Sequence, residues 1–331
     1  MSIVIRQAGI LTTVQDLGRL GWQHLGVPVG GVMDAVAHRI ANLCVGNADD
    51  DATLECTLGA VAVQFEAPSL VALAGRDITA SLDGAAVPAW RPILVKRGAL
   101  LVIHTGCRTT IAVAGGIRVP IVLDARSTVL RAGFGGFEGR VLRRDDRLAI
   151  GDPASLGGAI AARLDAENRV IGDFSAGWSL RPDYSATPTV RMIEGPEHRS
   201  LTDASRHALR DATFRIAPDS DRMGFRLTGQ TLELSSALEM LSSGVTAGTI
   251  QLPPGGAPIV LMSDRQTTGG YPRLGDVITV DLPLLAQLRP GDAVRFQLTD
   301  LDAAHELYRK RGRDLSSARS ALFMRYAQAL S

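Results

Sequence analysis

The sequence predicts a mainly β protein with few helices and a helical C-terminal tail. Short apolar runs rich in Val, Ile and Leu recur between Gly and Pro turns, and most are too short to form helices. The 35 glycines among 331 residues fit many tight turns. Because helices do not alternate regularly with the strands, barrels or sandwiches are favoured over a parallel βαβ sheet.

The expected strands follow the apolar runs along the chain. They cover residues 61–65, 70–74, 93–95, 100–104, 110–114, 119–123, 190–193, 259–262, 277–280 and 294–298. Two helices are expected before the tail. Asp34 is a suitable N-cap for the first, which ends near Gly46, and the second runs from about Leu201 to Asp211.

The length suggests two domains, at roughly 100–200 residues per domain. Residues 163–188 are rich in Gly, Pro and polar residues and lack apolar periodicity, so they predict a linker. We therefore expect one domain over residues 1–172, a second over residues 188–300 and the tail over residues 301–331. The charged tail with spaced apolar residues indicates packing against a barrel or, alternatively, contact with a partner.

The two halves of the sequence share a faint likeness. Each has an Arg-Gly type of turn, GRLG at 18–21 and DRMGFRL at 221–227. Each then has a Gly-Val segment that leads to a Gly-Gly pair, GVPVGG at 26–31 and GVTAGTIQLPPGG at 244–256. The pattern indicates two related barrels.

The composition argues against a strongly charged partner. The net charge is +1 and no basic face stands out, so we expect no nucleic-acid binding. The N-terminus lacks the features of a signal peptide, and no apolar run approaches the ~20 residues of a membrane span. The irregular spacing of Cys44, Cys56 and Cys107 favours buried thiols over disulfides or a metal pair. We therefore expect a cytoplasmic protein without a membrane segment.

Several common catalytic motifs are missing from the sequence. There is no P-loop, no GxSxG and no HExxH, and the six histidines show no metal-ligand spacing. Lys96 and Lys310 are the only lysines, and neither lies in the Ala-Met-Lys-Met context that is usual for a biotin-bearing lysine. We therefore expect no metal ligand and no covalent biotin on this chain.

Three segments carry more polar and Gly residues than a fold requires. They are residues 12–21 (TTVQDLGRLG), 220–227 (SDRMGFRL) and 259–272 (IVLMSDRQTTGGYP). In the third, an apolar strand runs directly into Asp264, Arg265 and Gln266, and two glycines and a tyrosine follow. Adjacent glycines allow backbone N–H groups to approach a ligand closely.

The side chains of this third segment complement an amide. A lactam or ureido group presents an N–H beside a C=O, and Asp264 with Arg265 or Gln266 matches that edge. The same donors can stabilise oxyanion charge while the carbonyl is attacked. The alternative is an internal ion pair that closes a hairpin, between Asp264 and either Arg265 or Arg222.

These segments resemble the signature of a family variously called allophanate hydrolase subunit 2, Kip antagonist or the C subunit of 5-oxoprolinase. Its members form subdomains A and B of a biotin-dependent carboxyltransferase domain. The resemblance runs from Ile5 to about Leu298 and includes TTVQDLGRLGWQHLGVPVGGVMD, NLCVGNADDDATLECTLG, SDRMGFRLTG, GTIQLPPGGAPIVLMSDRQTTGGYP and AQLRPGDAVRF. It implies two cyclophilin-like β-barrel halves, subdomain A over residues 1–172 and subdomain B over residues 188–300.

The resemblance also implies partners and three alternative functions. The first function is that of one component of an ATP-dependent 5-oxoprolinase, which opens 5-oxoproline to glutamate. It would act with a Kip inhibitor-like chain, the B component of 5-oxoprolinase, and, as a further expectation, with a LamB/YcsF-type A component. ATP, with or without Mg, is then shared within the complex. The second is a component of a biotin-dependent carboxyltransferase that acts on urea or a related amide. The third is a non-enzymatic antagonist of a kinase inhibitor.

The expected site draws on all three polar segments. Residues expected to take part in the chemistry are Asp264, Arg265, Gln266, Asp16 and Arg19. Residues expected to bind the substrate, a small amide or lactam, are Gln15, Asp34, Arg222, Thr267, Thr268, Gly269, Gly270 and Tyr271. For Asp16 and Asp34, turn or helix capping is an equal alternative. The substitution Asp264→Asn is expected to abolish activity at a nearly unchanged melting temperature, whereas a large loss of stability would support the ion pair.

Overall fold

The computed structural model describes residues 1–177 and 180–326, and these form two units. Unit 1 comprises Met1–Arg19, Asp34–Pro182 and the described part of Arg313–Ser331, and unit 2 comprises Leu20–Met33 and Asp183–Gly312. The change of unit at residue 182 falls inside the expected linker. Leu20–Met33 lies within the range predicted for the first domain, but it clusters with unit 2. Residues 178–179 and 327–331, predicted as linker and tail, lie outside the described residues.

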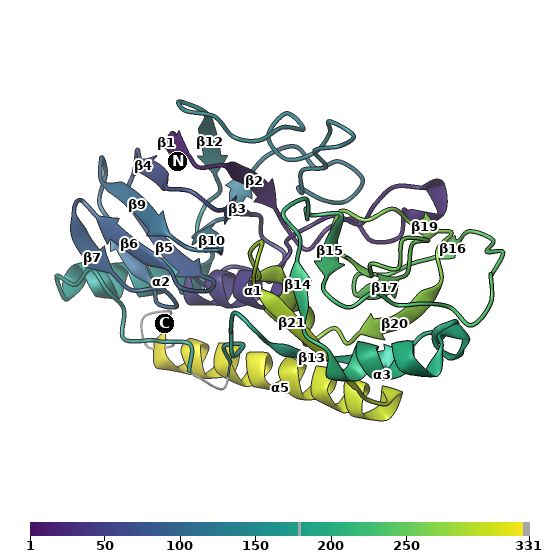
Figure 1. The fold of residues 1–331 in the computed structure, drawn as a ribbon. Coiled ribbons are helices and arrows are strands. Elements are labelled where there is room, and N and C mark those ends of the chain that lie inside the picture. Colours follow the sequence, from purple (N-terminus) through teal and green to yellow (C-terminus); the bar gives the residue numbers. More distant parts are fainter. Residues whose placement is uncertain (178–179, 327–331) are drawn as a thin grey trace. The chain divides into compact units, whose positions relative to one another are not determined.

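Unit 1 consists of two antiparallel sheets with one apolar core (Figure 1). The first sheet has the order β11 (Ile117–Arg118), β12 (Arg147–Ile150), β1 (Ser2–Ala8), β4 (Val61–Phe65), β9 (Leu100–Thr105), β6 (Thr79–Leu82) and β7 (Ala85–Val87). The second has the order β2 (Leu11–Gln15), β3 (Thr53–Thr57), β10 (Arg108–Val113), β5 (Ser69–Ala74) and β8 (Ile93–Val95).

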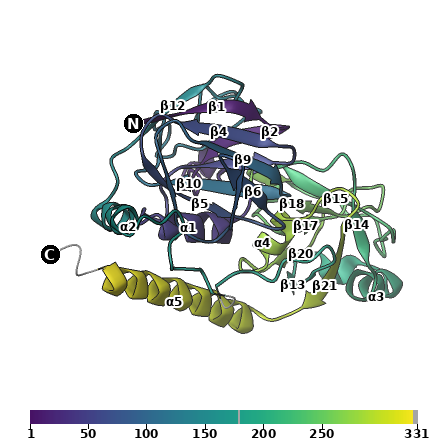
Figure 2. The same ribbon diagram turned by 90° about the vertical axis from the view of Figure 1, so that its left-hand side faces the viewer.

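Two helices cover the second sheet of unit 1. Helix α1 (Ala35–Cys44) packs against β5 and β10, and α2 (Ser155–Ala166) packs against β5 and β8 (Figure 2). Because α1 covers its outer face, β10 is buried along its whole length, and only Arg108 at its start is charged. The two layers therefore enclose the core between the sheets and extend it beneath the helices.

Unit 2 contains a closed barrel. Its order is β13 (Thr189–Glu194), β20 (Arg273–Val277), β17 (Thr249–Gln251), β18 (Ile259–Leu261), β15 (Gly224–Thr228), β14 (Phe214–Ile216) and β21 (Ala293–Leu298). The ring closes through the parallel pair β13 and β21, in which Val190 lies opposite Phe296. The rings of Phe214 and Phe296 lie 5.8 Å apart in the barrel core. Closure leaves no free strand edge in the barrel.

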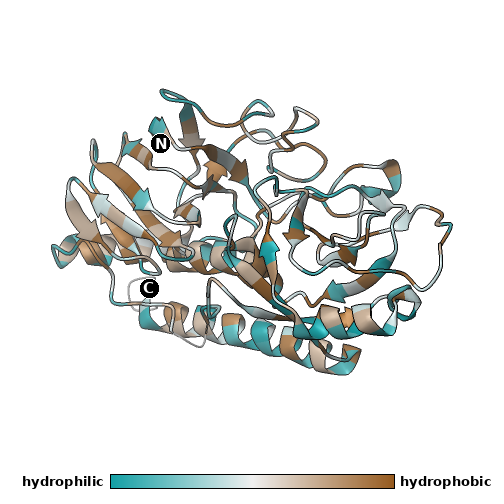
Figure 3. Cartoon of the chain, viewed as in Figure 1, coloured by the Kyte–Doolittle hydropathy of each residue, from teal (hydrophilic) through white to brown (hydrophobic). Residues whose placement is uncertain are grey.

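The remaining elements of unit 2 are short, apart from the C-terminal helix. They are η1 (Gln23–Leu25), η2 (His198–Ser200), α3 (Asp203–Asp211), α4 (Leu282–Ala286) and a two-stranded ribbon of β16 (Ser243–Gly244) and β19 (Thr268–Gly269). Helix α5 (Leu301–Tyr326) begins in this unit and carries both hydrophilic and hydrophobic residues (Figure 3). Its Ala304 and Leu307 pack on Ile278 and Val280. No described helix is long and apolar enough to cross a membrane.

The predicted mainly β class, the few helices and the helical tail are confirmed. The N-cap of α1 is Asp34, as predicted, and α3 ends at the predicted Asp211. The three cysteines are free and buried, as expected. Burial raises the pKa of the Cys44 and Cys56 thiols to about 12.

Two predicted strands were wrong, and the helices α2 and α4 were missed. Residues 119–123 form no strand, because Leu123 takes a left-handed φ of 52° and the chain turns there. In the run 277–280, only Val277 lies in a strand, because a turn follows in which the Asp281 N–H donates to the Ile278 oxygen. Helix α2 was missed because its two adjacent glycines disfavour a helix in isolation. Gly157 is needed there, since a Cβ at this position would lie 2.5 Å from the Val45 oxygen.

A chain of buried polar groups crosses unit 1. The Gly115 N–H donates to Asn47 Oδ1 (2.9 Å), and Asn47 Nδ2 donates to Asn42 Oδ1 (3.0 Å). The Asn42 amide is thereby oriented so that its Nδ2 faces His38 Nε2 at 3.2 Å. Nε2 is therefore an acceptor, and Nδ1–H donates to Thr53 Oγ1 at 3.0 Å. Protonation of Nε2 would place two donors against each other.

Burial lowers the pKa of His38 from 6.5 to about 4, against an opposing effect of the Asp16 carboxylate. Between pH 6.5 and pH 4, His38 is protonated in the unfolded chain and neutral in the folded chain. We therefore expect stability to fall as the pH drops from 6.5 towards 4, by up to about 3 kcal/mol from this group.

The substitution His38→Gln keeps polar groups at this position but does not titrate. We expect the variant to lose less stability than the wild type between pH 6.5 and pH 4. Urea unfolding at a series of pH values measures this difference. Equal pH slopes in the two proteins would contradict the assignment of the titration to His38.

Candidate functional site

The polar segment after β18 is held by a buried ion pair. Arg222 Nε and Nη2 donate to the two carboxylate oxygens of Asp264, each at 2.9 Å. The side chains are only 7% and 12% exposed, so the pair is bidentate and largely desolvated. The Asp264 N–H also donates to the Arg222 oxygen at 2.8 Å, which continues the pairing of β15 with β18. Of the alternatives that the sequence left open for Asp264, the geometry is that of the ion pair with Arg222.

The same pair holds part of the glycine-rich segment Leu20–Met33. Arg222 Nη2 donates to the Gly31 oxygen at 2.5 Å, and Ser263 Oγ donates to the Val32 oxygen at 3.0 Å. Met33 then inserts into the barrel core. Two of the three polar segments and this glycine-rich stretch therefore meet in unit 2.

Arg265 differs from its neighbour Asp264, because it has no carboxylate partner in the part of the chain that the structure describes. Its Nε and Nη1 donate only to the backbone oxygens of Val245 (3.4 Å) and Met262 (3.5 Å). Both distances are longer than the usual value of about 2.9–3.0 Å. Burial lowers the pKa of its guanidinium below the ordinary value. Arg265 is therefore a partly desolvated cation with weak neutral acceptors.

The chain after Arg265 forms one strand of the small ribbon. Thr267 is half-buried and Thr268 is exposed. Gly269 is buried and pairs with Ser243. A Cβ on Gly269 would lie 2.4 Å from Gln251 Nε2, so only glycine fits at this position without displacing that side chain. Gln251 Nε2 and Ser243 Oγ are buried and have no hydrogen-bond partner among the described residues. These two groups were not among the expected site residues.

The remaining predicted residues of this segment lie at the surface of unit 2. Gln266 and Gly270 are exposed, and Tyr271 is 44% exposed. Gly270 and Tyr271 line a cavity of about 590 Å³. This volume is in the usual range for a small-molecule pocket, about 300–1,000 Å³.

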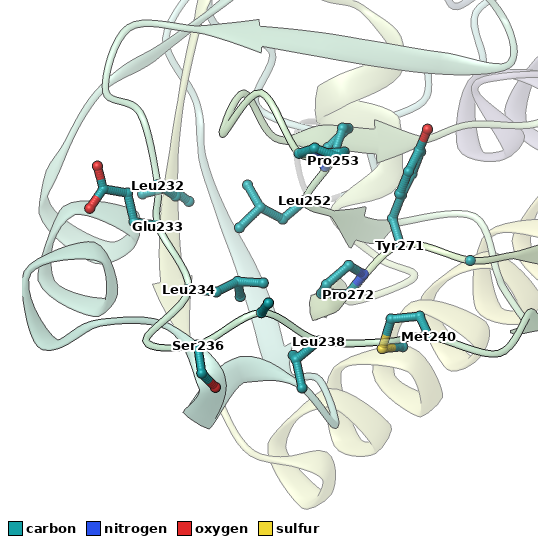
Figure 4. A pocket seen from close by; sticks show the side chains of 13 residues that line it. Leu232, Glu233, Leu234, Ser236, Leu238, Met240, Leu252, Pro253, Tyr271 and Pro272 are labelled. Atoms are coloured by element: carbon teal, nitrogen blue, oxygen red, sulfur yellow. The ribbon is translucent and has the colours of Figure 1, made fainter.

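The cavity is mostly apolar (Figure 4). Leu232, Leu234, Leu252, Pro253 and Pro272 form much of its wall. Glu233 is its one charged lining residue among the described residues, and no Arg or Lys lines it. Nucleotide phosphates need cations or a cradle of backbone N–H groups. The cavity therefore offers no cationic side chain to a nucleotide phosphate.

The predicted residues at the end of β2 fix a loop within unit 1. Asp16 Oδ1 accepts from the Gly18 N–H (2.9 Å) and from Ser127 Oγ (2.5 Å), and its Oδ2 accepts from the Arg126 N–H (2.5 Å). Arg19 is fully buried and donates to the Ser127 oxygen at 2.6 Å. Of the alternatives for Asp16, the geometry is that of a carboxylate that caps a turn and clamps a loop.

Gln15 and Asp34 complete the predicted set. Gln15 Nε2 donates to Thr13 Oγ1 (3.0 Å) and to the Thr128 oxygen (3.3 Å). Its Oε1 is buried without a hydrogen-bond partner in the described part of the chain. Asp34 accepts from the Ala37 N–H at 2.9 Å as the N-cap of α1. The structure therefore places Gln15, Asp16, Arg19 and Asp34 in unit 1, and the other predicted site residues in unit 2.

Residues 1–177 and 180–326 offer no cluster of metal ligands. No group of three or more His, Cys, Asp or Glu side chains in these ranges is arranged to hold a metal ion.

Comparison with known proteins places these features in a family. Residues 25–298 match the model of the family described as carboxyltransferase domain, subdomain A and B. The chain is 40% identical to the C subunit of 5-oxoprolinase from Escherichia coli (strain K12), over 91% of this chain and 92% of that protein. It is 35% identical to the corresponding 5-oxoprolinase protein of Haemophilus influenzae, over 90% of this chain and 91% of that protein.

A solved structure shares the fold. The crystal structure of the K. lactis urea amidolyase matches with a TM-score of 0.85 at 26% identity, over 96% of this chain and 20% of that chain. The match covers the described β units and not a local motif.

The ion pair of Arg222 and Asp264 leads to a prediction about stability. Asp264→Asn removes the carboxylate charge that faces the buried guanidinium of Arg222, and we expect it to lower the free energy of unfolding by about 3 kcal/mol. Asp219→Asn is the matched control, because Asp219 is 68% exposed in its pair with Arg226. We expect that control to change stability by less than about 1 kcal/mol. Equal urea midpoints for Asp264→Asn and the wild type would contradict a structural role.

The N-cap of α1 provides a second prediction. Asp34→Ala is expected to destabilise the protein by about 1 kcal/mol, whereas Asp34→Ser keeps an acceptor for the Ala37 N–H and most of the stability. Thermal unfolding of both variants measures the difference. If Asp34 acts only as a cap, Asp34→Ser also keeps the activity of the assembled enzyme, and a stable but inactive Asp34→Ser protein would assign the carboxylate a ligand role.

Proposed function

Because the chain belongs to the family of carboxyltransferase domains, subdomains A and B, we propose that it is one component of a 5-oxoprolinase. This enzyme would open the lactam ring of 5-oxoproline to glutamate with ATP. The observation that carries the proposal is the full-length match, since the alignment covers 91% of this chain and 92% of the E. coli 5-oxoprolinase protein. The chain therefore corresponds to nearly the whole of that 5-oxoprolinase protein and not to one part of it.

The segment from Ser263 to Pro272 is the proposed substrate-handling part of this chain. Arg265 and the neighbouring donors Ser243 and Gln251 offer hydrogen bonds that no described residue accepts with normal geometry. A carbonyl or carboxylate of a small cyclic amide accepts such bonds. In this proposal, Asp264 holds the turn that presents Arg265.

The nucleotide is proposed to bind outside the apolar cavity of unit 2. No Arg or Lys lines that cavity, so we do not place the triphosphate there. We propose that ATP binds elsewhere in a complex with a Kip inhibitor-like chain and a LamB/YcsF-type chain. The proposed compartment is the cytoplasm.

A biotin-dependent carboxyltransferase acting on urea is the second candidate. The match to the K. lactis urea amidolyase supports it, because the fold is shared over 96% of this chain. It has less support than the oxoprolinase, since the identity is lower and the chain spans only a fifth of that protein. An antagonist of a kinase inhibitor stays a prediction, because no feature of the described residues favours it.

Reconstitution of the complex tests the proposal. We expect 5-oxoproline to stimulate ATP hydrolysis and to yield glutamate when this chain is mixed with its Kip inhibitor-like and LamB/YcsF-type partners. The matched control is the same mixture without this chain. Urea-dependent turnover with a biotin carrier, in the absence of 5-oxoproline turnover by fully folded partners, would favour the second candidate instead.

A further inference from the structure

Arg265 lies near the start of the polar segment of unit 2. Its guanidinium has no carboxylate partner among the described residues. We propose that Arg265, Ser243 and Gln251 form a binding site for a small carboxylate. The proposal rests on the proposed function only for the identity of the ligand, which is then the carboxylate of 5-oxoproline.

The first argument is electrostatic. A partly buried guanidinium loses hydration, and two hydrogen bonds of 3.4 and 3.5 Å to neutral carbonyls compensate that loss poorly. A carboxylate supplies the opposite charge and two acceptor oxygens that match the planar fork of an arginine. Binding therefore relieves an unfavourable feature of the folded chain.

The second argument concerns the neighbouring acid. Asp264 adjoins Arg265 in sequence, but both of its oxygens accept from Arg222. The ion pair therefore consumes the nearby negative charge and leaves the positive charge of Arg265 for a ligand. The backbone bond from Asp264 N–H to the Arg222 oxygen (2.8 Å) and that from Arg265 N–H to the Met262 oxygen (3.3 Å) fix the turn.

The third argument comes from the ribbon beside Arg265. Val245, whose oxygen accepts from Arg265, follows Ser243 by two residues. Ser243 pairs with Gly269, and Gln251 Nε2 packs against that glycine. Ser243 Oγ and Gln251 Nε2 are both buried and unpartnered among the described residues. Buried polar groups in native proteins nearly always have a partner, so these two side chains are available to donate to an acceptor on a ligand.

The charge of the site favours a carboxylate over a phosphate. One guanidinium balances the single charge of a carboxylate, whereas a phosphate group at neutral pH carries about −1.5 to −2. Ser243 and Gln251 are neutral donors and add no charge.

A carboxylate is also present on 5-oxoproline and absent from its unsubstituted lactam, 2-pyrrolidinone. Comparing the two compounds therefore separates recognition of the carboxylate from recognition of the ring.

The first experiment measures thermal unfolding of the full chain with sodium acetate, against sodium chloride at equal ionic strength. We expect acetate to raise the melting temperature of the wild type and not that of Arg265→Met. Arg226→Met is the matched control, because Arg226 is 55% exposed and already paired with Asp219, and it should keep the acetate effect. An equal acetate effect in Arg265→Met and the wild type would overturn the site.

The same proteins distinguish a ligand residue from a structural one. Arg265→Met removes a charge that has no counter-ion among the described residues, so we expect a melting temperature equal to or above that of the wild type in chloride. Arg222→Met breaks a buried ion pair and should melt lower. A loss in Arg265→Met as large as that in Arg222→Met would show that Arg265 is structural and overturn the proposal.

The assembled enzyme provides the kinetic test. We expect Arg265→Met to raise the KM for 5-oxoproline at least ten-fold with a smaller change in kcat, and Arg265→Lys to restore part of the affinity. Competition by 2-pyrrolidinone should be unchanged by either variant. If 5-oxoproline is turned over with an unchanged KM in Arg265→Met, the carboxylate site is wrong and the proposed function stands. If 5-oxoproline is not turned over but acetate stabilises only proteins that contain Arg265, the function is wrong and the site stands.

Discussion

The bidentate ion pair between Arg222 and Asp264 organises the polar surface of unit 2. It joins the turn before β15 to the turn after β18, and its arginine also donates to the backbone of Gly31. Because both side chains are largely buried, neither charge has enough water to replace a lost partner. The ion pair therefore joins the glycine-rich segment Leu20–Met33 to the turn that precedes Arg265.

The polar side chains discussed above fall into two groups, according to how fully their hydrogen-bonding groups are satisfied within the protein. Asp16, Asp34 and Asp264 accept hydrogen bonds that cap a turn, cap a helix and close an ion pair. Arg265 and Gln251 are held in place without strong partners among the described residues. A polar side chain whose hydrogen bonds are all satisfied within the protein has a structural role. A polar side chain that is fixed in position but lacks strong partners is typical of a ligand-binding site. The proposed 5-oxoprolinase function gives that ligand a chemical identity, a small cyclic amide with a carboxylate.

Much of the fold could be predicted from local sequence patterns. Short β-branched runs mark β4, β8 and β21, and Asp34 marks the start of α1, because strand periodicity and helix capping are local properties. Helix α2 could not be predicted, since Gly157 is explained only by its close approach to the backbone at Val45. The exchange of Leu20–Met33 into unit 2 was equally hidden, because it depends on hydrogen bonds to residues about 190 to 230 positions away.

The sequence by itself determined the β-rich class, the helical tail and the polar segment from Ser263 to Pro272 as a site candidate, since these follow from composition, spacing and family signature. It named both Asp264 and Arg265, with Asp264 as the first choice for the chemistry and Arg265 as a donor to the ligand. Only the tertiary structure decided between them, by placing Arg222, 42 residues earlier in the chain, against Asp264 and no carboxylate of the described chain against Arg265. The physical reason is that a sequence specifies which charges exist, whereas their pairing and hydration depend on distances that only the folded chain sets.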